Sequence, residues 1–67
     1  MTPSEKAIEL VDYFMGQIDH LQTSKRCAIK VCEEIINTHY ENPIEIDFQT
    51  KIIEEIKAIY PRLMYTN

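Results

Sequence analysis

Apolar residues recur at helical spacing in three segments of the chain, with short polar breaks between them. The spacings are 4, 3, 4 and 3 in the first segment and 4, 4, 3 and 4 in the third, so each set lies on one face of an α-helix. The three stripes are Ala7, Val11, Phe14, Ile18 and Leu21; then Cys27 or Ala28, Val31 or Cys32, Ile35 and Ile36; then Phe48, Ile52, Ile56, Ile59 and Leu63. The pattern predicts helices over residues 3–21, 24–38 and 47–60 and no strand.

The predicted first and second helices have recognisable starting residues. Thr2 suits a capping position, Pro3 suits the first helical position, and Glu5 stands three residues after Thr2, which together form a capping box. At the second helix, the hydroxyl of either Thr23 or Ser24 can accept from the free N–H groups of the first turn. The second helix is therefore expected to begin at residue 24.

The third helix has two candidate starts. Asn42 can cap a helix that begins at Pro43, with Glu45 three residues further on. Alternatively, Asp47 can cap a helix that begins at Phe48, and we favour this start because the regular apolar stripe begins there.

Three amphipathic helices are most simply joined as an antiparallel bundle, in one domain over residues 1–67 with an apolar tail at 61–67. A domain of this size buries only about 60% of its unfolded surface. Gly16 marks either a close helix crossing or a tolerated surface position. Apolar residues also lie outside the main stripes: Ile8, Leu10, Met15, Ile36, Ile53 and Tyr60. We therefore expect self-association to complete the core, in a homo-oligomer that is a dimer or a higher ring.

Composition and charge narrow the function classes. The 7 Lys+Arg and 11 Asp+Glu give a net charge of −4, which argues against a protein that binds DNA by neutralising phosphates. No apolar run reaches the roughly 20 residues that cross a bilayer, and the first residues lack the basic and apolar pattern of a signal peptide. We expect a cytoplasmic protein that has no membrane partner.

The residues that could support catalysis or metal binding are few. Cys27 and Cys32 would point about 140° apart on a helix, so we expect two reduced thiols. Neither Cys-x-x-Cys nor His-x-x-x-His spacing occurs, so we expect no metal and no cofactor. The potential nucleophiles are Ser4, Ser24, Cys27 and Cys32, and the potential bases are His20 and His39. A small bundle offers no deep cleft to desolvate them. The chain is expected not to be an enzyme.

A group of hydroxyl and basic residues at the predicted start of the second helix is the best candidate binding site. A helix N-terminus has free N–H groups and a partial positive charge, and added hydroxyl, guanidinium and ammonium groups suit a phosphate or carboxylate. The candidate anion-binding residues are Thr23, Ser24, Lys25, Arg26 and Lys30. Basic residues in a first turn oppose the helix dipole. The alternative is that these cations pair with the acidic first helix, at Glu9, Asp12 and Asp19.

The chain also resembles a known group of proteins. The segments from Glu5 to Phe14, Lys25 to Asn37 and Phe48 to Ile59 are similar to the motifs KAxELVxxF, AKxCALxAVDEII and YWxEVKxEIEKL. These motifs occur in this order in small all-helical proteins of tailed bacteriophages and prophages. The resemblance implies a phage protein made in the cytoplasm of a bacterial host.

Three functions are compatible with these features. The first is a counter-defence protein that sequesters an anionic host immune signal, such as a cyclic nucleotide. The second is a direct inhibitor of a host defence or regulatory protein. Its expected contact residues are amphipathic side chains of types common at interfaces: Tyr40, Tyr60, Met64 and Tyr65. The third is a small virion or assembly component. We expect sequestration ahead of inhibition.

Overall fold

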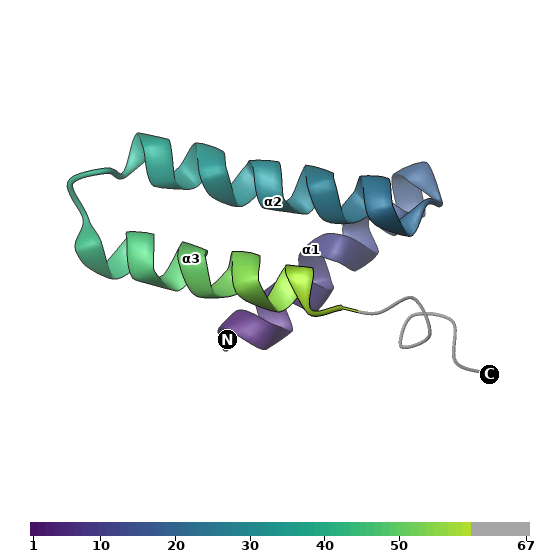
Figure 1. Cartoon of the computed structure of the whole chain (residues 1–67), viewed down its shortest axis with the longest axis horizontal. Coiled ribbons are helices and arrows are strands. Elements are labelled where there is room, and N and C mark those ends of the chain that lie inside the picture. Colours follow the sequence, from purple (N-terminus) through teal and green to yellow (C-terminus); the bar gives the residue numbers. More distant parts are fainter. Residues whose placement is uncertain (60–67) are drawn as a thin grey trace.

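The computed structural model describes residues 1–59, which form three α-helices: α1 (Pro3–Ile18), α2 (Leu21–Thr38) and α3 (Pro43–Lys57). Helices α2 and α3 form an antiparallel hairpin, and α1 crosses the half of this hairpin that lies away from the α2–α3 turn (Figure 1). All three pairs of helices are in contact. The predicted all-α bundle is confirmed, and the described residues contain no strand. The predicted apolar tail at 61–67 lies outside the described residues.

Helix α1 begins as predicted and ends early. The Thr2 hydroxyl accepts from the Glu5 backbone N–H at 3.2 Å, and the Glu5 carboxylate accepts from the Thr2 N–H at 2.8 Å, which confirms the capping box. The helix stops at Ile18 rather than at residue 21, because Asp19 adopts a left-handed conformation with φ 58°. Aspartate tolerates this conformation better than most residues. Leu21 consequently belongs to α2.

Helix α2 begins at Leu21, so the start predicted at residue 24 is wrong. The cap is His20, whose ring Nδ1 accepts from the backbone N–H of Thr23 at 3.2 Å. A histidine ring nitrogen thus replaces the hydroxyl that the sequence analysis expected. As a result, Thr23 and Ser24 lie inside the helix and cap nothing.

Helix α3 begins at Pro43, so the start favoured at Phe48 is wrong and the alternative is confirmed. The Asn42 side chain accepts from the Glu45 backbone N–H at 3.1 Å, and Pro43 occupies the first turn, where its missing N–H costs nothing. Asp47 lies one turn inside the helix and pairs with Lys51 at 3.0 Å. The helix ends at Lys57 rather than at residue 60.

The core follows the predicted stripes in most positions. Phe14 and Phe48 are half-buried and pack against the core, whereas Ile18 is 38% exposed because α1 ends there. Leu63 lies outside the described residues. The buried apolar side chains come from all three helices and from the residues that flank them: Ala7, Val11, Leu21, Ala28, Cys32, Ile52, Ile56 and Ile59.

The three helices cover more of the surplus apolar surface than predicted. Leu10, Met15 and Ile53 pack against the core, and among the residues outside the stripes Ile8 stays exposed, at 49%. A Cβ added at Gly16 would have nothing within 4 Å, so the close crossing proposed there is wrong and the position is an open surface. Self-association remains a prediction, and it now depends on fewer side chains.

Candidate functional site

The first turn of α2 is closed by its own cap. The ring Nδ1 of His20 accepts from the Thr23 N–H, and the Thr23 hydroxyl lies 2.9 Å from the same nitrogen. The next backbone N–H, that of Ser24, bonds the His20 carbonyl at 2.8 Å. Two of the donors expected to hold an anion are therefore already bound within the protein.

Ser24 is buried, so a ligand in solvent cannot reach its side chain. Its side chain is 0% exposed and faces the core. Its Oγ has no hydrogen-bond partner among the described residues. A hydroxyl at this depth cannot contact an anion that binds at the surface, so the structure separates Ser24 from the other predicted site residues.

Lys25 contacts the end of α3, which lies beside the start of α2 at the end of the hairpin away from the turn (Figure 1). Its Nζ donates to the carbonyl oxygen of Ile59 at 2.8 Å and to that of Lys57 at 3.4 Å. The last carbonyls of a helix have no partner inside the helix and carry partial negative charge. Lys25 thus stabilises the C-terminal end of α3, and the sequence analysis missed this role because the partners lie 32 and 34 residues away.

Arg26 and Lys30 remain at the surface. Lys30 pairs with Glu34 one turn later at 3.2 Å, and both side chains are more than half exposed, so the pair contributes at most about 1 kcal/mol. Arg26 is exposed and forms no ion pair with another described residue. The ion pairs within residues 1–59 all lie inside single helices, so the predicted pairing of these cations with α1 is wrong. Of the five predicted anion-site residues, Arg26 alone is both exposed and unpaired within this part of the chain.

A second candidate surface lies at the α2–α3 turn, where the hairpin extends beyond α1 (Figure 1). Tyr40 is 71% exposed and Ile44 is 82% exposed. We call Tyr40 and Ile44 the turn-end surface. Tyr40 was among the predicted contact residues and Ile44 was not, because the favoured helix start at Phe48 left residue 44 outside the third helix. The other predicted contact residues, Tyr60, Met64 and Tyr65, lie outside the described residues.

The segment of the chain that contains the turn-end surface is acidic. Residues 31–50 contain five carboxylates and neither lysine nor arginine. Lys30 and Lys51, which flank this segment, pair with Glu34 and Asp47. The Glu45 carboxylate accepts from the Gln49 side chain at 3.0 Å. The two carboxylates that remain, Glu33 and Glu41, are exposed.

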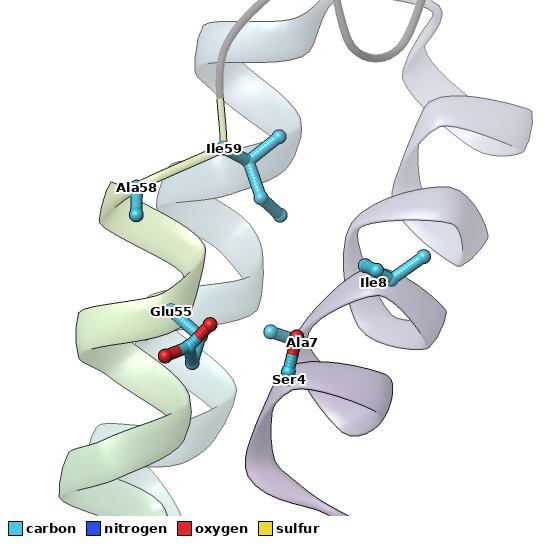
Figure 2. A pocket seen from close by; sticks show the side chains of 6 residues that line it. All are labelled: Ser4, Ala7, Ile8, Glu55, Ala58 and Ile59. Carbon is cyan, nitrogen blue, oxygen red and sulfur yellow. The ribbon is translucent and has the colours of Figure 1, made fainter.

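A shallow pocket of about 150 Å³ lies between the start of α1 and the end of α3. Ser4 and Ala7 lie opposite Glu55 across it, and Ile8, Ala58 and Ile59 complete the lining (Figure 2). Pockets that hold cofactors or drug-sized ligands are larger, at about 300–1,000 Å³. This pocket is too small to enclose a nucleotide.

The two thiols occupy different environments. Cys32 is fully buried, and burial raises the pKa of its thiol above the ordinary value of 9.0. The charge of Lys6 lowers this pKa and that of Glu33 raises it, each by less than burial does. Cys27 is half-buried and free. The thiolate is the reactive form of cysteine. Cys32 is therefore protected from reaction both by its burial and by its raised pKa, which keeps the thiol protonated.

Residues 1–59 contain neither a cluster of metal ligands nor a membrane-spanning helix. No three His, Cys, Asp or Glu side chains in this region stand close enough to hold a metal ion. None of α1, α2 and α3 combines the length and the apolar character of a membrane-spanning helix. Comparisons of the chain with protein-family models, with curated proteins and with solved structures found no match.

Proposed function

We propose that this chain is a non-catalytic binding protein that acts by docking on another protein. The observation that carries the proposal is the exposure of Tyr40 and Ile44, at 71% and 82%, at the end of the hairpin that α1 leaves uncovered. Single exposed apolar residues are common on soluble proteins, but neighbouring ones often mark an interface.

Two further observations favour protein binding over nucleotide sequestration. The anion-binding residues expected at α2 are separated: Ser24 is buried, and Lys25 donates to the carbonyls of Lys57 and Ile59 at and just beyond the end of α3. The pocket at α1 and α3, about 150 Å³ in volume, is below the size that encloses a nucleotide. A protein partner requires neither a pocket nor a basic cluster.

The resemblance to phage proteins supplies a biological context for the proposal. A phage protein that binds proteins in a bacterial cytoplasm is suited to counter-defence by direct inhibition of a host defence or regulatory protein. Sequestration of an anionic signal is the second candidate, supported by the exposure of Arg26 without an ion pair in the described region. In a homo-oligomer, copies of Arg26 could meet and form a shared basic site.

A paired experiment distinguishes the two candidates. The tagged chain is used to capture proteins from a bacterial lysate, and each captured protein is then purified and mixed with the chain to test for a stoichiometric complex. The untagged chain is titrated in parallel with cyclic dinucleotides and with phosphate by calorimetry. Protein binding predicts a reconstituted complex and no heat from the anions. Heat that the Arg26→Glu variant abolishes, without any reconstituted protein complex, would overturn the proposal in favour of sequestration.

A further inference from the structure

The turn-end surface combines apolar contact area with uncompensated negative charge. Tyr40 and Ile44 provide the exposed apolar part. Glu33 and Glu41 are exposed carboxylates with no cationic partner among residues 1–59. Apolar area provides affinity at an interface, and charge around it selects a partner of the opposite sign and speeds encounter.

A second copy of this chain is a poor occupant of this surface. In a two-fold dimer the same patch meets itself, so the exposed carboxylate of Glu41 beside Tyr40 in the turn would approach its copy in the other chain. Like charges that face one another across an interface disfavour the complex. The occupant that complements this surface carries apolar side chains together with Lys and Arg.

We propose that the turn-end surface binds a basic amphipathic helix of a partner protein. The apolar stripe of that helix packs on Tyr40 and Ile44, and its lysines and arginines lie near Glu33 and Glu41. This inference rests on the proposed function and adds the chemistry of the partner to it. Amphipathic helices that lay their apolar face on a hydrophobic surface are a recurring mode of peptide recognition.

The test uses a designed peptide of about 18 residues, or five helical turns, with leucines on one face and lysines and arginines on the other. The peptide is labelled, and its binding to the full chain is followed by fluorescence anisotropy at low and high salt. A peptide of the same composition in scrambled order removes the apolar face. A third peptide with glutamate in place of each basic residue reverses the charge.

The chain offers a matched pair of double variants. Tyr40→Ser with Ile44→Ser removes one tyrosine and one isoleucine from the turn end. Tyr13→Ser with Ile8→Ser removes the same residue types from the exposed surface of α1, where they are 62% and 49% exposed. The turn-end variant should weaken binding of the basic peptide by about tenfold or more, and the α1 variant should change it by less than about twofold. Circular dichroism confirms that both variants keep their helices.

Charge is tested separately by Glu41→Lys, at an exposed site in the turn, so the test does not depend on the double variants. This variant should weaken binding at low salt and reduce its salt dependence, because it reverses one of the carboxylates that attract the peptide. The acidic peptide should not bind the parent chain.

Several results would overturn the inference. Equal binding of the scrambled and designed peptides would show non-specific attraction, and equal effects of the two double variants would place the contact elsewhere. Light scattering that finds a dimer disrupted by the turn-end variant would make a second copy the occupant. The peptide could fail to bind while a reconstituted partner protein binds the parent chain but not the α1 variant. In that case the proposed function stands and the turn-end surface is the wrong binding site. If neither peptide nor protein binds, both proposals fail.

Discussion

Ser24 provides the strongest test of where α2 begins. Ser24→Ala should raise the free energy of unfolding if Ser24 is buried inside the helix, and lower it if Ser24 caps the helix. The Ser24 side chain is 0% exposed, and its Oγ has no hydrogen-bond partner among the described residues. A buried hydroxyl without a partner costs about 1–3 kcal/mol, since it has lost its bonds to water and gained none. Ser24→Ala removes this cost and should therefore stabilise the fold.

Two smaller contributions modify the expected magnitude. The lost oxygen leaves a void smaller than a water molecule, which at about 24 cal/mol per Å³ costs less than about 0.7 kcal/mol. Alanine also favours the helix over serine by up to about 0.5 kcal/mol. The two nearly cancel, so the free energy of unfolding should rise by about 1–3 kcal/mol. In a domain of this size, each kcal/mol raises Tm by about 4–8 °C.

Urea and thermal unfolding, followed by circular dichroism at one protein concentration, measure this change. Ser4→Ala is the matched control, because Ser4 is exposed in the first turn of α1. It should change stability by less than about 0.5 kcal/mol. If Ser24 instead capped α2, its replacement by alanine would cost about 0.5–2 kcal/mol. A Ser24→Ala variant less stable than the parent would refute the burial and restore the capping role.

Four further predictions test the helix ends, the surface and the thiols. Asn42→Ala should cost about 0.5–2 kcal/mol because it removes the α3 cap, whereas Asp47→Ala should cost less than about 1 kcal/mol because it removes an exposed ion pair; urea unfolding compares them. Gly16→Ala should stabilise by about 1 kcal/mol in the same assay, since the added methyl group meets open space. In the native protein Cys27 should react with a maleimide before Cys32, and equal rates would contradict the buried thiol. Because burial raises the pKa of Cys32, the folded state holds its proton longer than the unfolded chain, so stability should fall as the pH rises above 9.0 and this loss should be absent in Cys32→Ala.

The helices and most of the core could be predicted from the sequence because burial enforces a period of 3.6 residues. Ile52 and Ile56 satisfy that period and are fully buried. The ends of the helices were harder to predict, since each depends on one local hydrogen bond. A hydroxyl cap was predicted at α2 and an aspartate cap at α3, but His20 and Asn42 supply these bonds. Several side chains can cap a helix, so the pattern alone did not choose among them.

The candidate site was predicted less well because its chemistry depends on distant contacts. Lys25 reaches carbonyls 32 and 34 residues away, which no local spacing indicates. Ile44 follows a proline in a segment without a regular stripe, so its exposure became clear only when α3 was found to begin at Pro43. Tyr40 was predicted as a contact residue from its residue type. Sequence patterns thus gave residue types, and the fold determined which of them share a surface.

The position of Lys25 also explains a charge arrangement that opposes the dipole of its own helix. A cation in the first turns of α2 lies near the positive end of that helix, which is unfavourable. Lys25 extends to the carbonyls of Lys57 and Ile59, where the negative end of α3 offsets this cost. The Lys25 ammonium group is therefore bound within the protein, at the end of the hairpin away from the turn. The opposite end keeps exposed carboxylates beside exposed apolar side chains, so recognition of a basic partner is expected at the turn and not at the basic cluster.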